Sequence, residues 1–173
     1  MTSLGLLAYA GLGALAGTTA GLLGVGGGII VVPGLAFLLA DGPIPAERLM
    51  PVAVGTSLAT IVATSLSSIR AHHRRGAVRW DIVRRLAPGI VVGAGLGAAL
   101  ADALPTRALA LIFGAFLVAV AVRLALPGQP APHRDLPGTG TLGAWGTGIG
   151  TVSSLLGIGG GTLTVPLLTW CNV

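Results

Sequence analysis

The sequence predicts an all-α polytopic membrane protein, a bundle of hydrophobic helices of which two are broken by glycine. Three observations predict it. Of the 173 residues, 53% are hydrophobic and only 9% are charged, whereas about 25% are charged in an ordinary soluble domain. Apolar stretches recur at lengths suited to a hydrocarbon core about 30 Å thick, which takes about 20 helical residues to cross. A glycine-rich motif also occurs twice. We therefore expect the lipid bilayer as the main partner.

The net charge of +5 does not indicate a nucleic-acid partner. Six of the ten arginines lie in segment 70–85, which makes one charged loop and not a basic face. Aromatic residues that could stack on bases are few. The single cysteine, Cys171, excludes an internal disulfide. Because His72 and His73 have no third ligand nearby, we expect no metal site, and no motif indicates a cofactor.

The predicted elements follow from the apolar runs and from the polar residues between them. The runs, in chain order, are Leu4–Leu23, Ile29–Ala40, Val52–Ile69, Leu86–Leu104, Ala108–Leu126 and a last run that starts at Thr141. All except the second are long enough to be read as membrane helices, and the second is only about half a membrane thick. The chain is thus expected to cross the membrane several times.

A polar segment rich in proline and glycine, 127–140, divides the chain. We expect residues 1–126 to form a first transmembrane repeat, 127–140 a polar linker, and 141–173 the incomplete start of a second transmembrane repeat. Arginines near span ends mark the cytoplasmic side of a membrane protein. The loop 70–85 is therefore predicted to be cytoplasmic in a multi-pass protein of the cell membrane.

An internal repeat is the sharpest signal in the sequence. Segment Leu22–Pro33 matches Leu155–Pro166 at an offset of 133 residues, and eight of the twelve aligned positions are identical. The same offset relates three small residues before each motif, Gly13, Gly17 and Gly21 to Gly146, Gly150 and Ser154. We infer that the two halves of the chain share a design.

The repeated glycines predict interrupted helices. Each glycine costs about 1 kcal/mol inside a helix, so Gly26, Gly27 and Gly28 together favour a break by about 3 kcal/mol. Backbone groups freed at membrane depth must be buried in protein or line a wet cavity. The half-helices that restart at Ile29 and Thr162 would direct free amides and positive dipole ends into that cavity, which suits an anion. Matched interruptions of this kind indicate the substrate site of a transporter.

The symmetry of the repeat depends on the course of the chain after Gly28. If the chain folds back as a hairpin the halves are inverted, and if it continues across the membrane they are parallel. The short second run, Ile29–Ala40, favours inversion. By contrast, Gly89, Gly93 and Gly97 follow one another at four-residue spacing, and we interpret them as helix-packing residues only.

Four segments resemble the TauE/SafE family of sulfite and organosulfonate permeases: the two glycine motifs, Gly55–Leu58 and His73–Trp80. The resemblance implies a transporter for small sulfur-containing anions, such as sulfite, thiosulfate or sulfonates, and not an enzyme. The chain stops within the second repeat, which departs from the two-halved family pattern. A homo-oligomer and a complementing chain both remain open as partners. The alternative is a truncated, non-transporting membrane scaffold or subunit that needs a partner chain.

Candidate site residues come from the two motifs and from the resemblance. The motifs supply the backbone positions Gly24, Gly26, Gly27, Gly28, Gly157, Gly159, Gly160 and Gly161, together with Thr162. The resemblance adds Thr56 and Ser57 as side chains that contact the substrate. The opposing interpretation of these hydroxyls is a hydrogen bond to a carbonyl of their own helix. No catalytic residues are predicted.

Overall fold

The computed structural model describes residues 3–23, 26–40, 42–125 and 138–171. Within these ranges the chain forms seven α-helices and one 3-10 turn. They are α1 (Ser3–Leu23), α2 (Gly28–Leu39), η1 (Ala46–Arg48), α3 (Leu49–Arg74), α4 (Trp80–Ala103), α5 (Thr106–Ala125), α6 (Thr139–Leu156) and α7 (Gly161–Trp170). The predicted all-α class is confirmed.

Four of these helices are long and apolar enough to cross a membrane. The spans are Gly5–Leu22, Ala46–Arg74, Trp80–Ala103 and Thr106–Arg123. Large apolar side chains on the outside are widely exposed, among them Leu7 at 70%, Leu22 at 86% and Phe37 at 81%. Surfaces of this kind are avoided in water but suit a lipid environment. The described helices therefore form a multi-pass membrane protein, as predicted.

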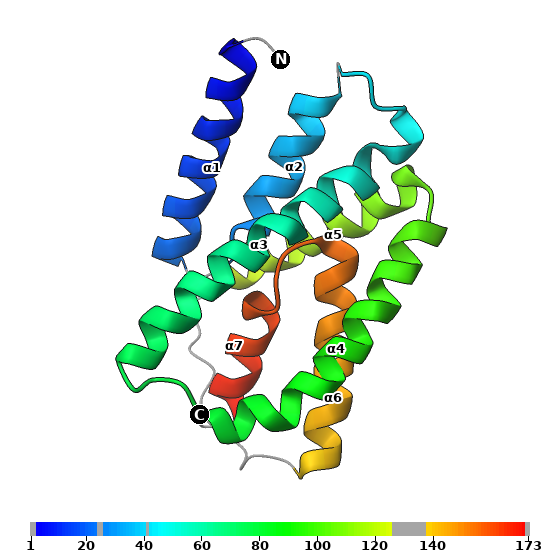
Figure 1. Ribbon diagram of the computed structural model, residues 1–173. Coiled ribbons are helices and arrows are strands. Elements are labelled where there is room, and N and C mark those ends of the chain that lie inside the picture. The colour runs from blue at the N-terminus through cyan, green and yellow to red at the C-terminus, as the bar shows by residue number, and fades with distance from the viewer. Residues whose placement is uncertain (1–2, 24–25, 41, 126–137, 172–173) are drawn as a thin grey trace.

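The first two and last two helices each form a hairpin. Figure 1 shows α2 running back beside α1, and α7 running back from the end of α6. α1 and α6 start at opposite ends of the bundle, so the two hairpins point in opposite directions (Figure 1). Helices α3, α4 and α5 lie between these hairpins in the chain.

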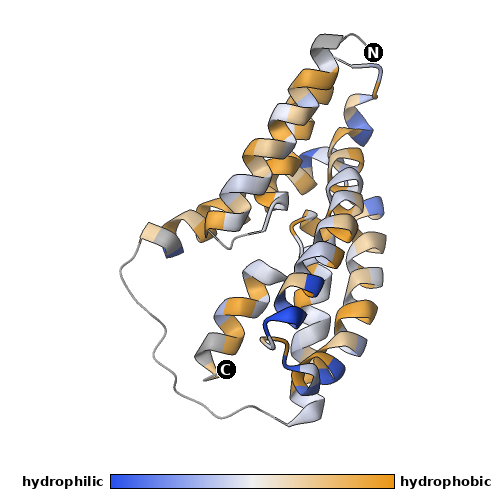
Figure 2. Cartoon of the chain, turned by 60° about the vertical axis from the view of Figure 1, so that its left-hand side comes forward, coloured by the Kyte–Doolittle hydropathy of each residue, from blue (hydrophilic) through white to orange (hydrophobic). Residues whose placement is uncertain are grey.

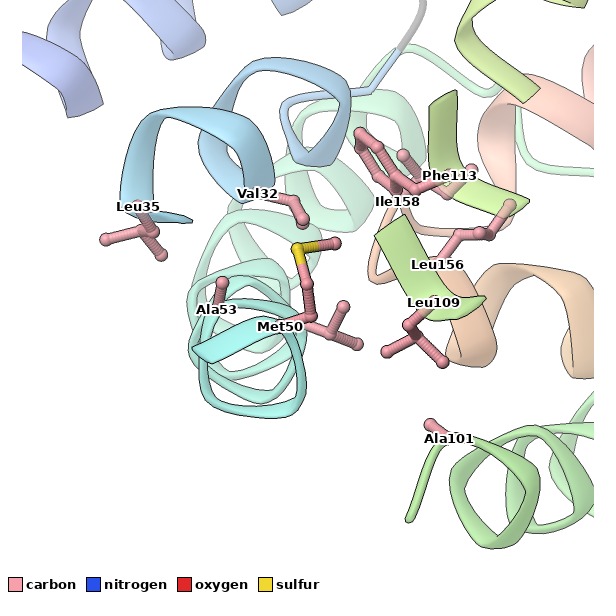
Figure 3. Packing of buried hydrophobic residues seen from close by; sticks show 10 residues of the cluster. Val32, Leu35, Met50, Ala53, Ala101, Leu109, Phe113, Leu156 and Ile158 are labelled. Carbon is pink, nitrogen blue, oxygen red and sulfur yellow. The ribbon is translucent and has the colours of Figure 1, made fainter. Parts of the chain in front are cut away.

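The main core joins side chains from both hairpins and from the helices between them. Val32 of α2, Met50 of α3, Leu109 of α5 and Leu156 of α6 are buried in it together with Ile158, which follows α6. Figure 3 shows these side chains directed toward one another from their helices. Full burial of an aliphatic side chain contributes about 1.5–3 kcal/mol in water, and close packing provides the attraction in lipid.

A glycine seam joins α4 to α6. A Cβ atom on Gly93 would overlap the carbonyl oxygen of Thr147, and one on Gly89 or Gly97 would likewise overlap the backbone of α6. Glycine therefore lets the two backbones approach until they touch. The packing role predicted for these three glycines is confirmed. α6 is not among the four apolar spans.

The predicted loop 70–85 is wrong in its extent. α3 continues to Arg74 and α4 already begins at Trp80, so only residues 75–79 lie between the helices. Hydropathy marks the point where side chains become polar, but backbone hydrogen bonding continues beyond it. α3 ends where Gly76 adopts φ +68° and the Ala77 amide donates to the His72 carbonyl oxygen at 3.1 Å, a glycine-terminated helix end.

The arginines of this region still gather at one end of the bundle. Figure 2 shows hydrophobic colour along the helices and most of the strongly hydrophilic colour near the end that holds the α3–α4 turn. Arg79 donates to Asp81 through Nε at 3.1 Å and Nη2 at 3.0 Å. Most of the predicted linker, residues 127–137, lies outside the described residues.

Candidate functional site

A cavity of about 750 Å³ brings the two glycine motifs together. Its walls come from α1, α2, α3 and the segment that leads into α7. The lining includes Gly26, Gly27, Gly28, Gly159, Gly160 and Gly161, the hydroxyl residues Thr56, Thr60, Thr64, Ser65 and Ser68, and the α1 residues Tyr9, Gly13, Gly17 and Gly21. Seven of the predicted site residues therefore lie around one space.

The first glycine motif separates α1 from α2. Gly26 has a φ of +79°, in the left-handed region that favours glycine. α2 then starts with Gly27 as its N-cap residue, whose carbonyl oxygen accepts from the Val31 amide at 2.9 Å, and no side chain caps this end. The amides in the first turn of a helix have no partner within the helix. The amide of Gly28, which lines the cavity, therefore remains a donor there.

The second glycine motif separates α6 from α7 in a similar way. Gly157 and Gly159 have φ angles of +68° and +70°. Gly160 then accepts a hydrogen bond from the Thr164 amide at 2.9 Å, just as Gly27 accepts from Val31 at the first motif. The first turn of α7, with its unpaired amides, thus also lies beside the cavity.

The two motifs contact each other directly. A Cβ atom on Gly28 would overlap the carbonyl oxygen of Gly157 and would lie 2.5 Å from the Cα of Ile158. A Cβ on Gly26 would lie 2.9 Å from the Ile158 carbonyl oxygen. Only glycine permits this approach of two backbones, so these residues shape the site as well as lining it.

The hydroxyl groups of α3 differ in their availability. Thr60 donates to the Ser57 carbonyl oxygen at 2.7 Å, and Ser65 donates to that of Val62 at 2.9 Å. Thr64 likewise donates within its own helix. Thr56 lines the cavity, is exposed, and makes no side-chain hydrogen bond to any described residue. Its hydroxyl is therefore available as a donor to a ligand.

Ser57 has a different position from the one predicted. Its side chain is fully buried, does not line the cavity, and donates to the Gly157 carbonyl oxygen at 2.7 Å. This hydrogen bond ties α3 to the second glycine motif across 100 positions in the sequence. In the described conformation Ser57 thus holds the cavity wall.

Three other predicted residues are not placed in the cavity. Gly157 is buried beneath the wall, where a Cβ would lie 3.1 Å from the Cα of Val54. Thr162 is half-buried, and its hydroxyl donates to the Gly159 carbonyl oxygen at 3.4 Å. Gly24 lies outside the described residues.

Sequence reasoning missed the contribution of α1 to the cavity. Gly13, Gly17 and Gly21 line it together with Tyr9. The small-residue pattern of α1 is visible in the sequence, but hydropathy alone does not say whether such a face contacts a helix or a ligand. Tyr9 gives no local signal at all.

No aspartate, glutamate, histidine, arginine or lysine is among the described residues that line this cavity. A negative ligand would meet backbone amides, helix dipoles and neutral hydroxyls there. Each helix N-terminus carries about half a positive charge. Binding of a negative ligand there would need no charged side chain in the bilayer interior, where one costs at least about 2.5 kcal/mol.

A second cavity of about 500 Å³ lies between the start of α4 and α7. His72, Arg79, Ile82 and Leu168 are among its lining residues. It contains neither glycine motif, and much of its wall is aliphatic. The larger cavity is therefore the candidate site.

Comparisons with known proteins identify related membrane proteins. The sequence matches the family described as "Sulfite exporter TauE/SafE" over residues 9–173. A "Probable membrane transporter protein" of Haemophilus influenzae is 40% identical over 160 residues, which cover 91% of this chain and 60% of that relative. "Probable membrane transporter protein YunE" of Bacillus subtilis is 30% identical over 176 residues, with 91% and 64% covered.

A further "Probable membrane transporter protein", from Xylella fastidiosa, is 30% identical over 178 residues, which cover 99% of this chain and 66% of the relative. The chain thus spans about 60–66% of the length of these relatives. No solved structure matches it. The family and its members are described as transporters and not as enzymes. Since the family match extends over nearly all of the sequence, the chain belongs to the TauE/SafE sulfite exporter family.

Proposed function

We propose that this chain forms the anion-binding part of a membrane transporter for small sulfur-containing anions, such as sulfite, thiosulfate or sulfonates. The observation that carries the proposal is the cavity onto which both glycine motifs open. In it the anion is held by the first-turn amides of α2 and α7 and by the Thr56 hydroxyl. The sulfur chemistry of the ligand rests on the description of the family.

We further propose that the halves are inverted repeats built around two glycine-broken helices. Helix α1 ends at Leu23 and α2 begins at Gly28, and at the offset of 133 residues α6 ends at Leu156 and α7 begins at Gly161. The opposite directions of the two hairpins in Figure 1 support inversion. Interrupted helices in an inverted repeat are a common way to build a transporter site near the centre of the membrane.

In this arrangement the α3–α4 turn faces the cytoplasm. Arg74, Arg75 and Arg79 lie at or beside the turn, and clustered arginines near span ends favour the cytoplasmic side. The start of α1 then lies on the other side of the membrane, because α1 and α3 run in the same direction with the hairpin return between them (Figure 1).

The test places a side chain inside the cavity without disturbing its walls. A Cβ on Gly27 or Gly160 has room, with the nearest atoms at 3.9 Å and 3.6 Å, and neither residue has a positive φ. Leucine at either position would fill space that an anion needs. Gly114→Leu on α5 is the matched control, since its Cβ would meet nothing within 4 Å and it does not line the cavity.

The measurement is the midpoint of thermal unfolding of the purified protein with added sulfite, thiosulfate, sulfoacetate or sulfate, because a ligand that binds the native state raises that midpoint. We expect a rise for the original chain and for Gly114→Leu, and none for Gly27→Leu or Gly160→Leu. An equal rise in all four proteins would exclude this cavity as the site. If no anion has any effect, the non-transporting subunit becomes the favoured function.

A further inference from the structure

One face of α1 has the composition of a helix contact but is exposed. Ala10, Gly13, Ala14, Gly17, Thr18 and Gly21 make up this face, which we call the α1 seam face, and all six residues are exposed. Cβ atoms on the three glycines would meet nothing within 4 Å. Small residues at this spacing let membrane helices approach closely, but the stripe alone does not identify a partner.

The second half of the chain supplies the missing observation. At the offset of 133 residues the α1 seam face corresponds to Gly143, Gly146, Thr147, Gly150, Thr151 and Ser154 of α6. All six residues lie at the contact with α4. Cβ atoms on Gly89, Gly93 and Gly97 would meet Gly143, Thr147, Thr151 and Ser154, and Cβ atoms on Gly146 and Gly150 would meet the backbone of α4. Gly146, Gly150 and Ser154 are buried there, and the other three are half-buried.

The same surface is therefore covered in one repeat and bare in the other. On α6 it is covered by α4, a helix of the first repeat. In an inverted repeat the counterpart contact joins α1 to the counterpart of α4 in the second repeat. At the same offset that counterpart would fall after Val173, and the relatives, of which this chain spans 60–66%, are long enough to contain it.

We propose that the α1 seam face is the docking surface for one membrane helix, the second-repeat counterpart of α4, with small residues at four-residue spacing. The helix runs parallel to α1, because Gly89, Gly93 and Gly97 meet Gly143, Thr147 and Thr151 in increasing order along both chains. Since Gly13, Gly17 and Gly21 also line the anion cavity, the docked helix occupies the side of the cavity next to α1 and forms its wall there.

The α4 sequence itself is a suitable probe. A synthetic peptide of residues 80–103 carries the seam glycines, and a helix that spans lipid needs no tertiary partner to form. The full chain carries a donor dye at its amino terminus, and the peptide carries an acceptor dye at its own amino terminus. Parallel docking on α1 would bring these two ends close together. Energy transfer is measured in lipid vesicles against peptide density, without any anion.

For the original chain we expect energy transfer to saturate as the peptide density rises. When the chain carries Gly13→Leu and Gly17→Leu, the peptide density needed for half-saturation should rise by at least about tenfold. The peptide with Gly89→Leu and Gly93→Leu should lose it equally. Ala8→Leu is the control, since Ala8 is exposed on α1 but outside the seam face. Helicity by circular dichroism checks that each variant folds.

Two results would overturn the proposal. Transfer that survives leucine at Gly13 and Gly17 would place the peptide elsewhere on the chain. Energy transfer can also be measured without peptide, between donor-labelled and acceptor-labelled copies of the chain. If such transfer occurs and is lost with leucine at Gly13 and Gly17, the occupant of the α1 seam face is a second copy of the chain. The inference rests on the repeat that the proposed function uses, but not on anion binding. Failure of the anion test therefore leaves this outcome unaffected.

Discussion

Thr56 and Ser57 are neighbouring hydroxyl residues of α3 with different surroundings. The Thr56 side chain lies at the cavity without a hydrogen-bond partner among the described residues. The Ser57 side chain is buried beneath the second glycine motif. At the scale of single residues the two positions therefore have separable roles, in ligand contact and in stability.

Thr56→Val removes the free hydroxyl and keeps the shape of the side chain. A hydrogen bond to a charged group contributes about 1.5–3 kcal/mol, so we expect anion affinity to fall by about tenfold or more. Titration of the purified protein by isothermal calorimetry measures it. Thr60→Val is the control, because the Thr60 hydroxyl already donates to the Ser57 carbonyl oxygen. Equal losses in both variants would contradict the role given to Thr56.

Ser57→Ala should affect stability. It leaves the buried Gly157 carbonyl oxygen without the donor that now lies 2.7 Å away, which costs about 1–3 kcal/mol. Unfolding by a denaturing detergent measures the difference. Ser65→Ala, which removes only a hydroxyl bonded within an exposed part of α3, should change stability by less than about 0.5 kcal/mol. An unchanged unfolding midpoint for Ser57→Ala would show that the hydrogen bond is not important.

The sequence identified Thr56 and Ser57 as candidate site residues, but it could not show which of them contacts a ligand and which one stabilises the fold. A hydroxyl near a glycine motif can face a ligand, its own helix or another element, and all three cases occur here within a few residues. The partner of Ser57 is 100 positions away. Local pattern carries no information about such a contact, because it depends on how the second hairpin packs against α3.

At the scale of helices, the α4–α6 seam offers a test with an internal control. Gly93→Ala places a methyl group against the Thr147 carbonyl oxygen and forces the two helices apart. We expect a loss of about 1–3 kcal/mol, as for other overpacked contacts. Gly95→Ala, two residues away, meets nothing within 4 Å.

Alanine is the better helix former by about 1 kcal/mol, so Gly95→Ala should be neutral or stabilising. Thermal unfolding of the two variants in the same detergent compares them directly. A smaller loss for Gly93→Ala than for Gly95→Ala would show that the seam does not hold α4 and α6 together.

The sequence predicted the presence and packing of helices where glycine spacing or the length of an apolar run marked them. It did not predict where helices end in polar segments. The packing role of Gly89, Gly93 and Gly97 follows from their four-residue spacing. The continuation of α3 to Arg74 does not follow from hydropathy, because backbone hydrogen bonds do not depend on whether side chains face lipid or water. Only Gly76, with its positive φ, marks where that helix ends.

At the scale of the whole molecule, orientation in the membrane is open to a direct measurement. Ala77 in the α3–α4 turn and Ala46 at the start of η1 are both exposed and lie toward opposite ends of α3, so each can be replaced by cysteine. In intact cells a membrane-impermeant thiol reagent should label Ala46→Cys and not Ala77→Cys until the cells are opened. The native thiol of Cys171 is buried and serves as the background. The reverse pattern would invert the proposed topology.

The class of the molecule was evident from composition alone, since 9% charged residues cannot cover a soluble surface of this size. The arrangement of the cavity was not. Its walls combine residues of α1, α3 and both glycine motifs, and no rule of local sequence specifies which of these elements become neighbours.

The touching backbones at Gly28 and Gly157 have a mechanical consequence. No side chain lies between them, so no side chain can change its rotamer to accommodate a relative shift of the two backbones. A tilt of either hairpin is passed on to the other at this point of contact. Any relative movement of the two hairpins must therefore turn about this point of backbone contact, because the contact cannot be compressed.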